Sequence, residues 1–586
     1  MKRVQNRHAV SLRFQFRSFL NRLRLLGLVR WLRKLPKMLT DPEYRRQEHA
    51  RNHRARIFHE QYIDFKEKYG GIFEKLALNN GIGKKALVIS TAEFPFFYQV
   101  ELAFVKALEL ANYETSLLLM PYSEAEWGVS KYYELSGVKE IYTWSDYYEP
   151  IDPRIAGSVL ENINTTREML ALERTGARVG KFAYTSALRS FRLGSLDFQS
   201  SHDCQILQNF LEFSIGSVDA AKRIIQEVHP DVLLLLNSLY TPEGELVDVC
   251  LNAGIDVILY EFSHKSGSLI FKRYKKENLD DHPATLSELS WKLVREMKWT
   301  DSCREQLQRE FQETYASRDW YSACCTQFNT SFSEAENLRS RLGLNSAKKT
   351  AFIFPHVSWD ASLMWGDDLF DSYEEFLLET VRAACRNSQV NWVIKIHPAY
   401  AGKNAIEGKQ GEASDLVALR RNIGILPEHI FVIPPESDIS TYSLYAIMDY
   451  CITVRGTVGI EAARLGIPVL TAGTGRYDRR GFTIDSESRE QYLKKINQIE
   501  DIPRLSKAQQ ELAERFAYGL FILRPFPLST VTFKNHKDFG MEKRFLKTQI
   551  NIRDNNEWAK AHDLKKLAEW INDQSQLDLL VDSDKE

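Results

Sequence analysis

The chain has 586 residues, of which 44% are hydrophobic and 26% are charged, and its formal net charge is -1. This composition is typical of a globular protein and excludes a largely disordered chain, and because single cores rarely grow past roughly 250 to 300 residues we expect at least two domains. The seven cysteines include no CxxC pair, which excludes a disulfide framework and a cysteine zinc motif and favours reduced thiols in a cytoplasmic protein.

Residues 1–40 form a strongly basic segment. They carry eleven Lys or Arg and no acidic residue, and apolar residues recur at helical spacing between residues 11 and 35. A basic amphipathic helix of this kind can lie among the headgroups of an anionic membrane, where each Lys or Arg adds on the order of 1 kcal/mol. We expect residues 1–80 to be a basic helical region that holds the protein peripherally on the inner face of the cytoplasmic membrane. Docking on the acidic body of the same chain and a transit peptide are the alternatives.

Residues 81–330 are expected to form a first Rossmann-like domain. A strand at 84–90, a helix at 100–110 and a strand at 116–120 make a βαβ unit, and helices are expected from 122 to 217. A buried strand at 231–236, a helix at 245–253 and a strand at 256–260 follow. Glu261, His264 and Lys265 come after the last strand, so each is a candidate acceptor contact, with an ordinary surface role as the alternative. Residues 270–342 are interpreted as a polar, helical connection.

Residues 331–500 are expected to form a second Rossmann-like domain. Strands at 350–354, 392–396, 429–433 and 450–454 alternate with helices at 371–386, 416–421, 441–448 and 459–465. Such regular alternation predicts a parallel sheet with both faces covered. Helices at 489–499 and 507–520, an irregular stretch at 523–539 and a last helix at 557–572 complete the chain.

The stretch from 449 to 477, DYCITVRGTVGIEAARLGIPVLTAGTGRY, predicts a nucleotide-binding site. Gly456, Thr457 and Val458 follow a strand and open a helix, where unpaired N–H groups can face a phosphate. Glu461 lies four residues after Thr457 and therefore shares its helix face, deeper in, where a ribose diol can be held. An ordinary βα turn with a capping threonine is the alternative.

A second signal lies upstream, in the stretch NWVIKIHPAY, residues 391–400. Its strand delivers Lys395, His397 and Pro398 to the same carboxyl edge of the sheet. Together with the 352–370 block, FIFPHVSWDASLMWGDDLF, these stretches resemble the bacterial capsule polysaccharide biosynthesis family, GT-B glycosyltransferases that include the capsule Kdo transferases. The resemblance covers roughly residues 349–477. It implies an α/β, GT-B-like fold of two Rossmann-like domains facing a cleft, an acceptor domain followed by a donor domain, with residues 501–586 forming C-terminal helices that cross back.

The resemblance also assigns chemistry to the donor domain. His397, Pro398, Gly456, Thr457 and Glu461 occupy the positions that frame the donor nucleotide. A transferase needs positive charge on the leaving phosphate and, if it inverts, a base on the acceptor hydroxyl. His397 is the first catalytic candidate, as donor to that phosphate.

Further roles are assigned by position in the sequence. Lys395 and Arg455 are cations at the same edge, as are Lys403 and Arg476, and Tyr477 is expected to stack on or close over the base. Asp360, with His356 beside it, is the candidate carboxylate. No DxD pair follows a strand, and Asp367–Asp368 is interpreted as a helix start. We expect no metal and no cofactor beyond the donor.

The favoured function is a glycosyltransferase that extends a lipid-linked or growing surface polysaccharide. CMP-Kdo is the donor that the resemblance suggests, with a UDP- or GDP-sugar as the open alternative. A polyol-phosphate transferase of the teichoic-acid type and a non-catalytic scaffold of capsule assembly are the other hypotheses. A nucleic-acid partner is not expected, because nothing in the sequence supplies a matching fold or a stacking platform.

Overall fold

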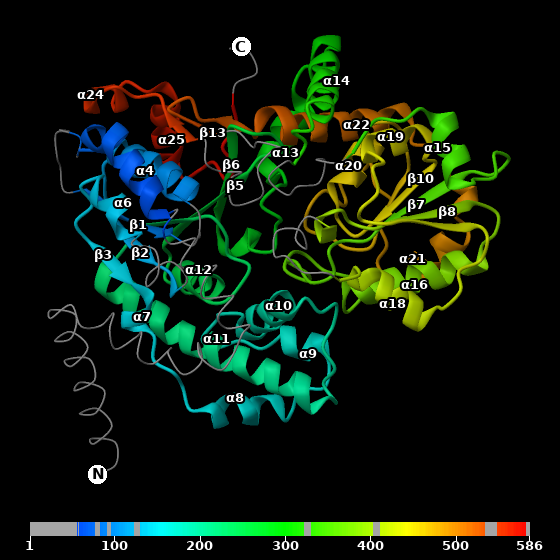
Figure 1. The fold of residues 1–586 in the computed structure, drawn as a ribbon, viewed down its shortest axis with the longest axis horizontal. Helices are drawn as coiled ribbons and strands as arrows, with labels where there is room; N and C mark the ends of the chain where they lie inside the picture. Colours follow the sequence, from blue (N-terminus) through cyan, green and yellow to red (C-terminus); the bar gives the residue numbers. More distant parts are fainter. Residues whose placement is uncertain are drawn as a thin grey trace. The chain divides into compact units, whose positions relative to one another are not determined.

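A computed structural model describes the chain apart from residues 1–55, 57, 75, 77–82, 91–94, 122–128, 322–329, 402–410, 534–547 and 582–586 (Figure 1). The predicted basic helix of residues 1–40, and Lys403, therefore lie outside the described residues. The chain divides into two compact units, Met1–Lys68 with Glu126–Gly128, and Tyr69–Ala125 with Val129–Glu586. The second unit carries all the features below. No helix in the described ranges is long and apolar enough to span a bilayer.

The first sheet of this unit has seven strands in the order β12-β6-β5-β4-β1-β2-β3. Their bounds are Lys84–Ser90 (β1), Tyr113–Leu119 (β2), Ile141–Thr143 (β3), Val232–Leu235 (β4), Asp256–Phe262 (β5), Ser268–Tyr274 (β6) and Phe526–Pro527 (β12). β1 to β5 pair parallel with one another, whereas β6 pairs antiparallel with β5 and β12 pairs antiparallel with β6. β4 is buried along its whole length, as expected for a parallel strand covered on both faces.

Helices pack on this sheet, and most of them lie in the sequence between β2 and β4. They include α4 (Pro95–Leu110), α6 (Ser130–Glu134), α7 (Trp144–Tyr147), α8 (Pro153–Leu160), α9 (Thr166–Leu170), α10 (Val179–Phe191), α11 (Ser201–Val228) and α12 (Glu243–Asn252). The long α11 lies along α8, α10 and α12 (Figure 1). It begins where the Ser200 hydroxyl accepts the Asp203 N–H, and it ends at His229, whose backbone is left-handed. The helices predicted between residues 122 and 217 are thus present among the residues described, and the strand β3 in the same stretch was not predicted.

The polar connection predicted for residues 270–342 is wrong at its start. Residues 268–274 form β6, and all seven are buried. The charges of Lys272 and Arg273 obscured this strand in the sequence. Lys272 pairs with Asp578 at 3.3 Å and Arg273 pairs with Asp256 at 2.9 Å, so their burial is compensated. Helices α13 (Glu288–Glu296), α14 (Asp301–Ala316) and α15 (Ala335–Leu342) follow.

The second sheet has five strands, all parallel, in the order β11-β10-β7-β8-β9. They are Thr350–Phe354 (β7), Asn391–Lys395 (β8), Ile430–Ile433 (β9), Tyr450–Thr453 (β10) and Val469–Thr471 (β11). The helices are α16 (Tyr373–Arg386), α18 (Ser414–Asn422), α19 (Thr441–Leu444), α20 (Thr457–Ala463), α21 (Arg489–Asn497) and α22 (Lys507–Tyr518). The predicted parallel sheet is confirmed, and with it the GT-B-like class of two Rossmann-like sheets.

The last part of the chain differs from the sequence interpretation. The stretch predicted to be irregular contains β12, which extends the first sheet, and β13 (Val531–Phe533), which pairs with β14 (Thr548–Ile550). The predicted last helix is two helices, α24 (Asn555–Trp558) and α25 (His562–Asn572). α25 packs on α4, and the Trp558 indole donates to the Ile72 carbonyl at 2.6 Å (Figure 1). The C-terminal helices therefore lie against the first sheet's helices.

Candidate active site

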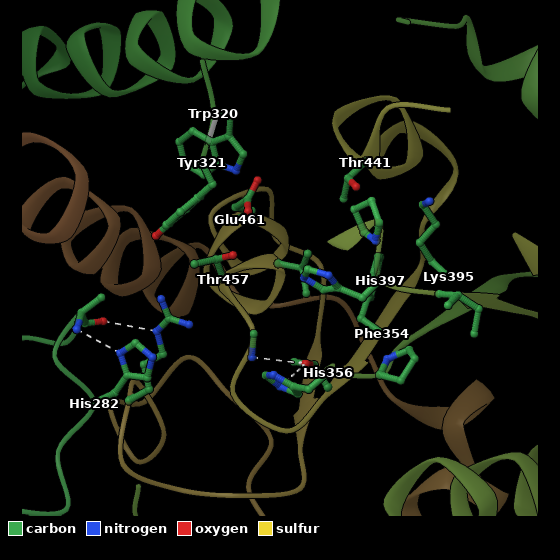
Figure 2. Close-up of a pocket in the computed structure, with 18 of the residues that line it drawn as sticks. His282, Trp320, Tyr321, Phe354, His356, Lys395, His397, Thr441, Thr457 and Glu461 are labelled. Atoms are coloured by element: carbon green, nitrogen blue, oxygen red, sulfur yellow. Dashed lines mark hydrogen bonds between the residues drawn. The ribbon is translucent and has the colours of Figure 1, made fainter. Parts of the chain in front are cut away.

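A cavity of about 300 Å³ lies at the carboxyl ends of β5, β7, β8 and β10 (Figure 2). Seven residues of the two predicted donor motifs line it together: Lys395, His397, Pro398, Gly456, Thr457, Val458 and Glu461. They come from two stretches about sixty residues apart, and the parallel pairing of β8 and β10 with β7 brings both to one sheet edge. The predicted gathering of these side chains is therefore present in the structure.

Lys395 and His397 form one cationic and hydrogen-bond-donating wall. The Lys395 side chain ends β8 and is 4% exposed, and burial lowers its pKa to about 8, against a smaller opposing effect of Glu436. Nδ1 of His397 accepts the Ala399 N–H at 3.2 Å, so the neutral ring carries its proton on Nε2. Both side chains thus have N–H groups suited to an anion in the cavity.

The turn after β10 differs in one respect from its predicted role. The Gly456 N–H donates to the Thr453 hydroxyl at 3.2 Å, and the Arg455 N–H donates to Nε2 of His356 at 3.1 Å. The N–H groups of Thr457 and Val458 remain as the backbone donors at the start of α20. α20 has only seven residues, and the Lys and Arg side chains that line the cavity beside this turn are Lys395 and Arg476.

Glu461 lies deeper, against an aromatic wall that the sequence interpretation missed. Burial raises its pKa, and its carboxylate accepts the Tyr315 hydroxyl at 2.6 Å. The Tyr315 ring stacks on Trp320 with centroids 4.9 Å apart, and Tyr321 completes the wall. The run of aromatic residues after a polar helix, ETYASRDWY, was the signal available in the sequence.

His264 and Lys265, predicted to reach the cleft, instead support this wall. Nε2 of His264 lies 2.7 Å from Glu310, and Nζ of Lys265 lies 3.0 Å from the same carboxylate. The His264 carbonyl accepts the Tyr321 N–H at 2.6 Å. Burial lowers the pKa of His264, and Glu310 opposes this effect. The pair therefore fixes α14 and the aromatic segment after it.

The first domain contributes Glu261 and His282 to the opposite wall. Glu261 is half-buried in the cavity lining, and within the described residues its carboxylate makes no hydrogen bond. Burial raises its pKa to about 7, although Arg476 and Arg524 act in the opposite direction. Burial, and then Arg476, lower the pKa of His282 well below its usual value. His282 lies in the stretch interpreted as a connection, so no sequence pattern pointed to it.

Arg476 is the cation of this wall. Its guanidinium is held by two carbonyls, those of Ala284 at 3.2 Å and Arg455 at 3.1 Å, and among the described side chains it forms no ion pair. Figure 2 shows His282 on the far side of Thr457 from Lys395 and His397. Arg476 contacts Ala284, two residues after His282, so the cavity has a cation on each side of the turn at residues 456–458.

Three predicted site residues lie outside the cavity lining. Asp360 turns toward α10, where it pairs with Arg189 and accepts the Tyr240 hydroxyl at 2.7 Å. Asp360 is therefore not beside His356 in the cavity lining, although the two residues are close in the sequence. Tyr477 is buried behind the turn and donates to the Gly456 carbonyl at 2.7 Å, a position that rules out stacking on a base in the cavity. The buried Arg455 guanidinium pairs with Asp368 at 2.6 Å.

No cluster of three or more His, Cys, Asp or Glu suited to a metal occurs in the described parts of the chain.

Comparison with known proteins places part of this chain. Residues 313–513 match the family model described as capsule polysaccharide biosynthesis protein. The resemblance to this family is confirmed. The match covers about a third of the chain and includes every cavity residue named above except Glu261, His282 and Ala284.

Solved structures were also compared with the chain. The beta Kdo 2,4 transferase of Thermosulfurimonas dismutans KpsC is 15% identical, covers 56% of this chain and 87% of its own, and has a TM-score of 0.30. The UDP-GlcNAc 2-epimerase of Neisseria meningitidis is 10% identical, with 75% and 96% covered and a TM-score of 0.26. A glycosyltransferase from Rickettsia africae is 9% identical, with 84% and 100% covered and a TM-score of 0.26. No curated protein sequence matches the chain.

The position of Tyr477 behind the turn predicts the effect of Gly459→Ala. An added Cβ would overlap the Tyr477 hydroxyl, so we expect a loss of about 2 kcal/mol in the free energy of unfolding, measured by urea denaturation. Tyr477→Phe alone should lose about 1 kcal/mol with its hydrogen bond. The double variant should lose less than the sum, since the hydroxyl is no longer there to overlap. Additive losses would contradict the placement of Tyr477.

Proposed function

We propose that this protein is a glycosyltransferase of capsule polysaccharide biosynthesis that transfers a sugar from a nucleotide-sugar donor. The carrying observation is the convergence of Lys395, His397 and Arg476 on a cavity that also contains Thr457 and Glu461. Transfer from a nucleotide sugar builds negative charge on the leaving phosphate, and fixed cations and N–H donors in a partly dry cavity stabilise that charge. The family match over residues 313–513 supports the same reading.

The donor nucleotide is assigned to the wall of the second domain. Its phosphate lies against Lys395, Nε2 of His397 and the N–H groups at the start of α20. Its ribose is held by Glu461, whose carboxylate is already oriented by Tyr315, and its base lies toward the wall of Trp320 and Tyr321. Aromatic rings and a neighbouring carboxylate suit a nucleoside, because one contacts the flat base and the other accepts from hydroxyls.

The two cationic ends favour a donor with two separate anionic groups. A phosphate at Lys395 and His397 leaves His282, on the other side of Thr457 (Figure 2), for a second anion. Arg476, which donates to the carbonyl of Ala284 two residues after His282, is available to the same anion. A carboxylate on the sugar itself meets this requirement, and CMP-Kdo has both groups. A UDP- or GDP-sugar has two adjacent phosphates and no second, separate anion, so it would leave one of the two cationic ends without an anionic partner. The fixed cations also perform the task of a divalent metal, so we propose a metal-independent reaction.

Glu261 is assigned to the acceptor. It is the carboxyl of the first domain that faces the cavity, and with a pKa of about 7 it is ionised in part at neutral pH and remains basic enough to take a proton from a hydroxyl. The acceptor is a lipid-linked or growing polysaccharide at the inner membrane surface. The eleven basic residues within residues 1–40 support an attachment to that surface.

Nucleotide binding provides the first test. With CMP at about 100 times its dissociation constant, the protein should gain about 2.7 kcal/mol in stability, seen as a rise in its melting temperature. Lys395→Met and Thr457→Ala should reduce this rise. Lys494→Met is the matched control, because Lys494 is an exposed cation of α21 in the same domain.

The same melting-temperature measurement with CDP, UDP, GDP and ADP identifies the donor class. A response to UDP or GDP in place of CMP would replace CMP-Kdo by another sugar nucleotide, and a response to CDP would favour polyol-phosphate transfer. If no nucleotide stabilises the protein, the glycosyltransferase assignment fails and the scaffold hypothesis takes its place.

The lowered pKa of Lys395 predicts a pH-dependent affinity. Only the protonated amine attracts the phosphate, and the protonated fraction falls as pH rises through about 8. The dissociation constant of CMP, measured by calorimetry, should therefore rise by about tenfold between pH 7 and pH 9. The nucleotide phosphate, whose second pKa is about 6, is already about nine-tenths ionised at pH 7, and its remaining ionisation would tighten binding and so cannot cause the rise. The arginine of Lys395→Arg keeps its charge at pH 9, so the dissociation constant of CMP in this variant should stay nearly constant between pH 7 and pH 9. If the variant shows the same rise as the wild type, the assignment of Lys395 is contradicted.

Glu261→Gln separates catalysis from donor binding. The variant should bind CMP within about twofold of the wild type, but its release of CMP from CMP-Kdo should fall by about 100-fold or more, because the amide cannot accept the proton. In the wild type this rate should rise with pH through about 7 as Glu261 ionises. A variant that keeps the wild-type rate would exclude Glu261 as the base.

A further inference from the structure

Arg455 makes an unusual set of contacts for a residue beside a ligand cavity. Nη2 donates to Asp368 at 2.6 Å, Nη1 to the Tyr373 hydroxyl at 2.8 Å and Nε to the Thr474 carbonyl at 2.9 Å. The Arg455 and Asp368 side chains are only 2% and 8% exposed. Every guanidinium nitrogen is thus engaged inside the protein, and the charge is neutralised before any ligand arrives.

The backbone of Arg455 connects this buried pair to the cavity. Its N–H donates to Nε2 of His356, which lines the cavity, and its carbonyl accepts Nη1 of Arg476 at 3.1 Å. The next residues are Gly456 and Thr457 of the phosphate-facing turn. A shift of Arg455 would therefore move the turn and the Arg476 guanidinium together.

Asp368 is held in turn by the segment after β11. Leu369 N–H donates to the Ala472 carbonyl at 3.0 Å, and Asp368 pairs with Gly473 in an isolated β-bridge. A Cβ on Gly473 would lie 2.6 Å from Oδ1 of Asp368, 2.6 Å from Cγ1 of Val454 and 2.7 Å from Nη2 of Arg455. Glycine is therefore required for the carboxylate and guanidinium to meet. The interpretation of Asp367–Asp368 as a helix start is wrong, since α16 begins at Tyr373.

We propose that Asp368 and Arg455 are a positioning pair: they touch no donor atom, and they hold the turn at residues 456–458 and Arg476 in the geometry that binds the donor phosphate and carboxylate. The binding role rests on the proposed function, whereas the positioning role concerns this chain alone. By neutralising Arg455, Asp368 also leaves Arg476 and Lys395 as the cations that face the cavity.

Asp368→Asn tests the pair, with Asp367→Asn as the matched control. Asp367 is adjacent and exposed, so both variants remove one negative charge from the same loop. Hydrogen–deuterium exchange of the unliganded proteins should show about tenfold faster exchange at residues 454–458 and 472–477 in Asp368→Asn. Exchange in β8 and β9 should stay at the wild-type rate. Asp367→Asn should leave all of these segments unchanged.

Gly473→Ala gives an independent approach to the same pair. It changes no charge, but its methyl group forces Asp368 and Arg455 apart, so the same two segments should exchange faster. Faster exchange throughout the second domain would show a merely structural ion pair and would overturn the proposal. Unchanged exchange at residues 454–458 in Asp368→Asn would overturn it as well.

CMP binding provides the functional readout. The dissociation constant should rise by about tenfold in Asp368→Asn and in Gly473→Ala, and stay within about twofold of the wild type in Asp367→Asn. Fast local exchange with unchanged CMP affinity would refute the positioning role in binding. If the wild type itself does not bind CMP, the donor assignment fails, while the exchange measurements still decide whether the pair holds the turn.

Discussion

The candidate site depends on how positive charge is divided at the carboxyl edge of the second sheet. Arg455 is buried and neutralised by Asp368, whereas Lys395 and Arg476 are buried without a carboxylate contact within ion-pairing distance among the described residues. Leaving a cation in such a place costs solvation, which is visible in the lowered pKa of Lys395. That cost is recovered when an anion binds. The arrangement therefore favours an anionic ligand over an empty cavity.

The same sheet edge explains why residues of different origin meet. β7, β8 and β10 are parallel neighbours, so the segments that follow them all begin at one edge. The segment after β7 contributes His356, that after β8 contributes His397, and that after β10 contributes the turn. β5 of the first sheet adds Glu261 from the opposite side. In the reaction proposed above, the candidate base and the candidate phosphate site therefore come from different domains.

Much of the second domain was predictable from the sequence. Its strands are short, apolar and separated by helices of ordinary length. The hydrophobic periodicity and the turn residues therefore located these strands and helices to within a few residues. The segment of β6 was missed because its Lys272 and Arg273 suggest solvent exposure. Only their partners Asp578 and Asp256, the first of them about three hundred residues away, make burial possible.

The sequence by itself determined the fold class, the two motifs and the seven residues of those motifs that line the cavity, because strand ends and local spacing fix which residues reach the carboxyl edge. Only the tertiary structure decided the roles of Asp360, Arg455 and Tyr477. For each of them, a partner from another part of the chain fixes the direction in which the side chain points. The partner is Arg189 for Asp360, Asp368 for Arg455 and the Gly456 carbonyl for Tyr477. Local spacing carries no information on such partners, since folding alone brings them into contact.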